Sequence, residues 1–148
     1  VGGSRRSPLG RDVAVAGWLV DNSAASRMRS VHVAAQLREL AGTLHLCPVG
    51  RLEQLYSARS AGDYDRLGTE LTEAFLAADP PDDVFNRTLV LQRDLAHHHG
   101  LWHRVPLPDL LIAETALHHG LGILHVDRHY ERIAEVRPLT VRRLAADD

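Results

Sequence analysis

The strongest structural signal in the sequence is an apolar helix that is followed at once by an apolar strand. Residues 108–119 begin with a proline, carry apolar side chains on most of the helix surface, and precede Gly120, a residue type that commonly ends helices. Residues 121–126 form an apolar run of strand length, typical of a strand covered on both faces. A buried helix joined directly to a buried strand predicts an α/β fold with a parallel sheet.

The rest of the chain repeats this alternation of strands and helices. Further strands are predicted at residues 13–20, 43–47, 75–78 and 139–144, the last at a sheet edge because Pro138 adjoins it. Helices are predicted at residues 24–28, 31–40, 49–58, 63–73, 83–98 and 129–136. Asn22 or Ser23, and later Asp63, are the expected N-caps. Residues 1–11 are polar and rich in glycine and arginine, which predicts a mobile tail before a single domain at 12–148.

Composition excludes several classes of protein. The formal net charge of −2 means that overall basicity does not predict a nucleic-acid partner, so any such binding needs a local patch. All 17 basic residues are arginine, which removes the lysine of a P-loop and of Schiff-base enzymes. The single cysteine, Cys47, fits a reducing compartment, and no apolar run approaches the roughly 20 residues of a membrane span. With no signal-peptide pattern at the start, we expect a cytoplasmic protein.

Four acidic residues occupy positions where a parallel α/β sheet gathers its chemistry. Asp21 and Asp127 directly follow predicted strands. Asp109 lies in the first turn of the apolar helix, and Glu53 lies in the helix after the second strand. Right-handed crossovers bring such positions to one edge of the sheet, where the carboxylates repel unless they are protonated or neutralised by a cation. Their hard oxygens suit Mg²⁺ or Mn²⁺, and an ion held in this way can activate water against a phosphodiester.

Four segments also resemble the successive acidic motifs of PIN-domain ribonucleases, specifically the VapC toxins of bacterial toxin–antitoxin pairs. They are VDNSA at 20–24, CPVGRLEQLYSAR at 47–59, VPLPDLLIAETALHHG at 105–120 and LHVDRHYERIA at 124–134. The resemblance covers about residues 13–144 in the correct order. It implies a three-layer α/β/α sandwich around a central, mainly parallel sheet, and a Mg²⁺- or Mn²⁺-dependent endoribonuclease of a type II toxin–antitoxin system. It also implies an RNA substrate, a homodimer, and inhibition by a cognate VapB-type antitoxin.

The resemblance also assigns roles to individual residues. Carried over position by position, it implies that the catalytic and metal-binding acids are Asp21, Glu53, Asp109 and Asp127. Ser23 matches a small hydroxyl residue that follows the first acid by two positions, where it would orient that acid or a metal-bound water. Residues 1–11 lie outside the resemblance.

Basic residues near these acids are candidate contacts for the substrate. His129 stands where many relatives have a further acid, so a second metal is expected to bind weakly or only with substrate. His129 is itself a candidate substrate contact, and Arg104, just ahead of the apolar helix, is a candidate phosphate ligand. An arginine at such a position is more often simply exposed, and the same holds for Arg27 and Arg29.

Simpler interpretations stay open for each residue taken singly. Asp21 and Asp109 also fit helix caps or first-turn acids, and Glu53 fits a solvated helix residue. Asp127 also fits a surface ion pair with the adjacent Arg128. Only the joint pattern favours a site. The histidines of the second half lack the ligand spacing of a zinc site.

Two alternative functions remain for the whole chain. One is a catalytically degenerate PIN-like protein that binds an antitoxin or RNA without cleavage, and the presence of all four acids argues against it. The other is an aspartate-based phosphatase or phosphoacceptor that uses Asp21. The missing lysine argues against that reading, as does Ser23, which stands where a second acid would be needed.

Overall fold

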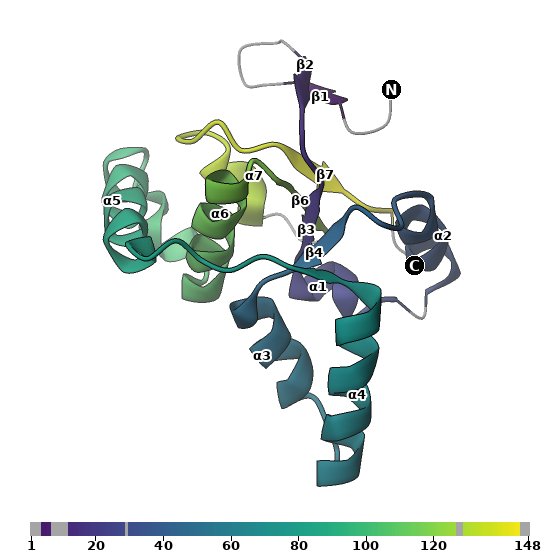
Figure 1. Cartoon of the computed structure of the whole chain (residues 1–148). Helices are drawn as coiled ribbons and strands as arrows, with labels where there is room; N and C mark the ends of the chain where they lie inside the picture. Colours follow the sequence, from purple (N-terminus) through teal and green to yellow (C-terminus); the bar gives the residue numbers. More distant parts are fainter. Residues whose placement is uncertain (1–3, 7–11, 29, 127–128, 146–148) are drawn as a thin grey trace.

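A five-stranded parallel sheet forms the centre of the computed structural model, which describes residues 4–6, 12–28, 30–126 and 129–145 (Figure 1). The strands lie in the order β5-β4-β3-β6-β7, and every neighbouring pair is parallel. Their bounds are β3 (Trp18–Val20), β4 (Leu44–Leu46), β5 (Leu76–Ala77), β6 (Gly122–His125) and β7 (Val141–Arg143). The prediction of a mainly parallel sheet is confirmed, as is the edge position of the last strand.

Helices connect these strands. They are α1 (Asn22–Ala25), α2 (Val31–Glu39), α3 (Pro48–Tyr56), α4 (Ala61–Ala74), α5 (Val84–His97), α6 (Leu107–His119) and α7 (His129–Ile133), with the short 3-10 helix η1 (Leu101–Arg104) before α6. The sequence predicted each α-helix, although it did not predict η1. Within the part of the chain that the structure describes, none of these helices is long and apolar enough to cross a membrane.

The sheet separates two hydrophobic cores and so confirms the three-layer α/β/α sandwich. Along β3, Leu19 packs into the core shared with α5, α6 and α7, whereas Trp18 and Val20 pack into the core shared with α1 and α2. Ile123 and Leu124 of β6 divide in the same way. Figure 1 shows α5, α6 and α7 on one side of the sheet and α2 on the other. Burial on both faces explains why the strands read as continuous apolar runs.

Helix α6 is buried over most of its length, which fixes the position of its first turn. Prolines at 106 and 108 begin the helix, and Gly120 ends it in the left-handed region with φ +67°. The backbone N–H of Leu121 then donates to the carbonyl of Ala116 over 2.9 Å and leads directly into β6. Because α6 precedes β6 and packs against it, the first turn of α6 lies at the edge where the parallel strands end.

The N-terminal part of the fold differs from its prediction. The predicted strand at 13–20 is divided into β2 (Asp12–Ala14) and β3, because residues 12–14 leave the central sheet and pair antiparallel with β1 (Ser4–Arg6). The sequence predicted no regular structure before residue 12, since the polar run around β1 has no hydrophobic period. The domain boundary at residue 12 stays a prediction.

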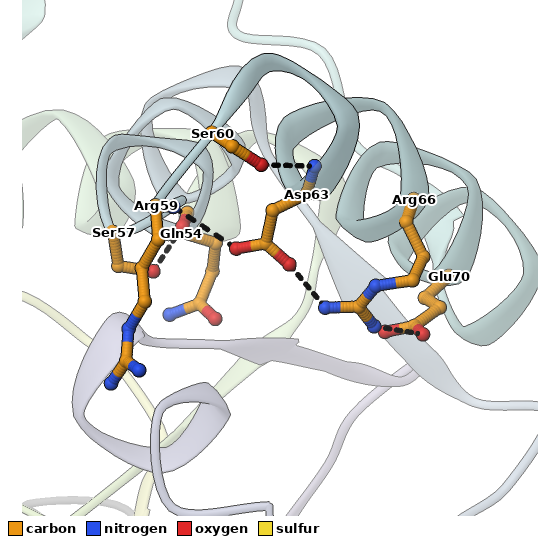
Figure 2. Close-up of polar contacts among 7 residues, drawn as sticks. All are labelled: Gln54, Ser57, Arg59, Ser60, Asp63, Arg66 and Glu70. Atoms are coloured by element: carbon orange, nitrogen blue, oxygen red, sulfur yellow. Dashed lines mark hydrogen bonds and ion pairs between the residues drawn. The ribbon is translucent and has the colours of Figure 1, made fainter.

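The turn between α3 and α4 is held by a capped helix start, as Figure 2 shows. The cap of α4 is Ser60, whose Oγ accepts from the backbone N–H of Asp63 over 3.0 Å. Asp63 was predicted to be the cap; it is instead a first-turn acid that accepts from the backbone N–H of Arg59 over 3.0 Å and pairs with Arg66. The Arg66 pairs with Asp63 and Glu70 are solvent-exposed and contribute little, so the backbone bonds are what order this turn.

A close approach at Gly122 yields a direct test of the packing between β3 and β6. A Cβ at this position would lie 2.6 Å from Cζ3 of Trp18 and 3.2 Å from the carbonyl oxygen of Thr140. We predict that Gly122→Ala lowers the free energy of unfolding by about 1–3 kcal/mol, because the buried indole must move. Urea denaturation measures the change.

Gly62→Ala in the first turn of α4 is the matched control. Its nearest atom is Oγ of Ser60 at 4.0 Å, so the added methyl group meets open space and the unfolding free energy stays the same or rises. Equal stability of the Gly122→Ala variant and the parent protein would show that β3 and β6 do not pack as described.

Candidate active site

Three of the four predicted acids line one pocket at the edge where β3, β4 and β6 end. The pocket has a volume of about 280 Å³. Its lining residues come from α1 and the turn after it, from α3, from the start of α6 and from α7; they are Asp21, Asn22, Ser23, Ser26, Arg27, Glu53, Pro106, Pro108, Asp109 and His129. The fourth predicted acid, Asp127, lies outside the described residues. This edge includes the point where the strand order reverses around β3, the usual place for a site in such a sheet.

Asp21 follows β3 directly, and both oxygens of its carboxylate accept hydrogen bonds. Oδ2 accepts from the backbone N–H of Ser23 over 3.0 Å, which makes Asp21 the N-cap of α1 in place of the predicted Asn22 or Ser23. Oδ1 accepts from the hydroxyl of Tyr130 over 2.5 Å. The backbone N–H of Asp21 donates to the carbonyl of Leu124 in β6. The side chain is buried, so these bonds hold it in one orientation. Asp21 is therefore a helix cap, as the simpler interpretation proposed, and its carboxylate also lines the pocket.

Tyr130 is a residue of this site that the sequence reasoning missed. It lies in α7 and is fully buried, with only its hydroxyl reaching Asp21. Burial raises the pKa of Tyr130 well above its ordinary value, and the nearby charges of Asp21 and Asp109 raise it further. The phenol therefore stays protonated and donates to Asp21. A buried tyrosine hydroxyl usually needs a hydrogen-bond partner, but the sequence does not identify Asp21 as that partner.

Glu53 reaches the pocket from α3 with one oxygen that has no partner. Its Oε1 is buried and accepts no hydrogen bond from any residue that the structure describes. Burial raises the pKa of Glu53, and the negative charge of Asp21 adds to that rise. A buried carboxylate oxygen without a hydrogen-bond partner costs free energy, and a cation bound at this oxygen would offset that cost.

Asp109 occupies the first turn of α6, where its carboxyl is buried beside the other two acids. Burial, then the charge of Asp21, raises the pKa of Asp109 from 3.8 to about 7; a smaller rise comes from Glu53. His129 opposes this effect, because its Nδ1 lies 3.1 Å from Oδ2 of Asp109. Asp109 is thus close to half-protonated at neutral pH unless a cation stabilises its charged form.

Ser23 joins two edges of the pocket. Its backbone N–H donates to Asp21, while its hydroxyl accepts from the backbone N–H of Val126 over 3.0 Å. The hydroxyl thus ties the start of α1 to the residue that precedes Asp127 in the chain. Ser23 therefore orients Asp21 through its backbone N–H, whereas its hydroxyl binds Val126.

The basic candidates divide between the pocket and the surface. His129 lines the pocket, whereas Arg104 is exposed at the end of η1 and is not among the lining residues. Arg27 lines the pocket instead, with Nη1 donating to the carbonyl of Ser23 over 2.8 Å. The buried Glu114, further along α6, places its Oε2 3.7 Å from Nε of Arg137 and does not line the pocket.

A metal ion is chemically compatible with this pocket but would need ligands besides the described side chains. Within residues 4–6, 12–28, 30–126 and 129–145, no group of three His, Cys, Asp or Glu side chains is placed to hold a metal by itself. Mg²⁺ commonly binds through one or two carboxylates and completes its shell with water. Asp21, Glu53 and Asp109 supply hard oxygen ligands. Among the described residues, Oε1 of Glu53 has no hydrogen-bond partner, so this oxygen is available to bind such an ion.

Comparison of the sequence with known proteins gives a consistent result. A family model described as the PIN domain matches residues 19–136. Ribonuclease VapC17 of Mycobacterium tuberculosis is 53% identical over 124 residues, which cover 82% of this chain and 90% of the relative. Ribonuclease VapC21 of the same species is 38% identical over 121 residues, covering 80% and 87% respectively.

Comparison of the structures agrees with this result. VapBC2 from Rickettsia felis, bound to a DNA fragment from its promoter, matches with a TM-score of 0.71 at 12% identity, over 86% of this chain and 98% of that one. VapBC from Salmonella typhimurium, also bound to DNA, matches with a TM-score of 0.69 at 16% identity, over 86% and 97%. At these identities the likeness shows the fold alone. Together with the family model and the close relatives, it shows that the chain belongs to the PIN domain family, and within it to the VapC proteins.

Proposed function

We propose that this chain is a divalent-metal-dependent endoribonuclease that acts as the toxin of a type II toxin–antitoxin pair. The observation that carries the proposal is the convergence of three carboxylates on one pocket, with the pKa of Asp109 raised to about 7 and that of Glu53 also raised. Burial raises both pKa values most, and the charge of Asp21 adds to each rise; a bound cation would stabilise the charged carboxylates against both effects. The relatives that cover most of the chain are named as ribonucleases, which supports RNA as the substrate.

The residues proposed to hold Mg²⁺ or Mn²⁺ are the four acids singled out in the sequence, Asp21, Glu53, Asp109 and Asp127. A divalent ion there would supply the charge that polarises a phosphodiester and readies a water for attack. The chain itself keeps the carboxylates in place: Tyr130 holds Asp21 through its hydroxyl, and His129 holds Asp109. The hydroxyl of Tyr130 and the backbone N–H of Ser23 donate to the two oxygens of Asp21, so this carboxylate keeps one orientation in the pocket.

We further propose a VapB-type antitoxin and a second copy of the chain as protein partners. The structural neighbours are VapBC complexes, which supports an antitoxin of this type. Large apolar side chains are exposed on α3 and α4 and separately on α5, as expected where protein partners bind; they are Leu52, Tyr56, Tyr64, Phe85 and Leu89. Action on cellular RNA also requires the cytoplasmic location that the sequence predicts.

Cleavage by two matched variants of α6 tests the proposed activity. Asp109 and Glu114 are both buried acids on this helix, but only Asp109 lines the pocket. We predict that Asp109→Asn lowers the rate of RNA cleavage at least about a hundredfold, because it removes a charged metal ligand. Glu114→Gln should cleave at the parent rate. The measurement is cleavage of total bacterial RNA in Mg²⁺ and in EDTA, resolved by sequencing of fragment ends.

Two results would contradict the proposal. Fragments that form equally in EDTA would exclude the metal-dependent reaction, and fragments that form equally with Asp109→Asn would exclude the assigned site. Absence of any cleavage by the folded parent protein, free of copurified antitoxin, would favour a degenerate protein that binds without cutting.

The pH dependence of stability tests whether Asp109 is buried beside the other charges of the pocket. Because the folded pKa of Asp109 is about 7 against an ordinary value of 3.8, the folded state keeps a proton that the unfolded state has lost. The contribution of this group to stability is therefore complete below about pH 4 and is lost as the pH rises to 7. In EDTA, we predict that Asp109→Asn gains roughly 2–4 kcal/mol of unfolding free energy relative to the parent across this range.

Adding Mg²⁺ at pH 8 should then raise the melting temperature of the parent more than that of Asp109→Asn, because a cation stabilises the ionised carboxylate. Urea titrations at several pH values and thermal melts with and without Mg²⁺ provide the measurements. Parallel stability curves for the two proteins at all pH values would mean that Asp109 does not lie among repelling charges.

A further inference from the structure

A pocket lined by carboxylates repels an RNA substrate, because each phosphodiester also carries a negative charge. The described residues of the wall include three acids, Asp21, Glu53 and Asp109, and only two basic residues, Arg27 and His129. Nδ1 of His129 lies 3.1 Å from Oδ2 of Asp109, so this ring nitrogen already interacts with one of the three acids. Among the described lining residues, Arg27 is the one whose side chain carries a permanent positive charge.

Arg27 is fixed in place without being neutralised. Its Nη1 donates to the carbonyl of Ser23 over 2.8 Å, which holds the guanidinium against the start of α1. No carboxylate of a described residue forms an ion pair with it, and its other N–H groups have no partner there. The residue is exposed, whereas Asp21 and Asp109 are buried at 5% and 8% exposure. The acids thus lie deep in the pocket, and the arginine lies at its rim.

We propose that Arg27 binds a non-bridging oxygen of the RNA phosphodiester that lies over the carboxylates, an inference that rests on the ribonuclease function proposed above. A guanidinium keeps its charge at every physiological pH and offers a planar fork of donors that matches a phosphate. Since this chain has no lysine, arginine is its means of holding a phosphate with a permanent charge. Arg104, the arginine favoured by the sequence, does not line the pocket.

A binding experiment with matched charge changes tests this role. Arg27→Gln removes the arginine of the pocket, and Arg93→Gln removes another exposed arginine, which lies on α5 and does not line the pocket. A fluorescently labelled single-stranded RNA is titrated with each folded protein at several salt concentrations. EDTA is present throughout, because removal of divalent ions should prevent hydrolysis. We predict that Arg27→Gln binds about tenfold more weakly. The slope of log K against log salt should fall by about 0.7, as expected for one lost contact to single-stranded phosphate. Arg93→Gln should match the parent in both measurements.

Kinetics in Mg²⁺ separate a substrate contact from a structural effect. Because the phosphate contact is present before and during the reaction, Arg27→Gln should raise KM about tenfold with much less change in kcat. Arg27→Lys keeps the positive charge but loses the planar fork of donors, so its KM should lie between that of the parent and that of Arg27→Gln. A melting temperature close to that of the parent shows that the variant is folded.

The outcomes distinguish the two proposals. If the parent binds and cleaves RNA while Arg27→Gln does both equally well, Arg27 has no role and the ribonuclease function stands. A loss confined to kcat, with RNA binding unchanged, also overturns the substrate-binding role. If the parent neither binds nor cleaves RNA, the proposed function fails and this inference fails with it.

Discussion

Asp21, Glu53 and Asp109 are held around one pocket although their negative charges repel, and the surrounding structure has to oppose that repulsion. Burial of the Asp109 carboxyl, and after it the charge of Asp21, raises its pKa from 3.8 to about 7, which costs up to about 4 kcal/mol at neutral pH. Helix α6 carries this acid on a segment with several fully buried apolar side chains, including Leu110 and Ile112. Burial of each of these two side chains contributes about 1.5–3 kcal/mol, so the helix stays in place against the repulsion.

Hydrogen bonds then orient the carboxylates that packing has brought together. Tyr130 and the backbone of Ser23 fix the two oxygens of Asp21, while the hydroxyl of Ser23 binds the main chain at Val126. These contacts join β3, α1, β6 and α7 at one edge of the sheet. An acid with both oxygens fixed loses little conformational entropy when a cation or a substrate binds, which is the usual advantage of a preorganised site. Arg27 lines the same pocket and is exposed, so the pocket is acidic in its buried part and basic at its exposed rim.

Much of the arrangement could be predicted from the sequence, because it depends on local patterns that alternate regularly. The pairing of α6 with β6 follows from a proline start, a glycine end and two apolar runs. The gathering of Asp21, Glu53 and Asp109 follows from the geometry of a parallel sheet, although Glu53 is singled out only by resemblance to a family, since one glutamate in a helix carries no signal. What the sequence missed depends on contacts between distant segments. Tyr130 meets Asp21 across 109 residues, and no local pattern distinguishes Arg27 from Arg104 as the arginine that faces the pocket.

We propose that these carboxylates bind a divalent cation at the edge of the sheet, and anomalous X-ray diffraction from crystals grown with Mn²⁺ would locate it. We expect a manganese peak in the pocket between Asp21, Glu53 and Asp109, and loss of that peak in crystals of Asp109→Asn. A manganese peak elsewhere, for example at the histidines of residues 97–99, with none in an open pocket would contradict it. The position of the ion would also show whether the free Oε1 of Glu53 is one of its ligands.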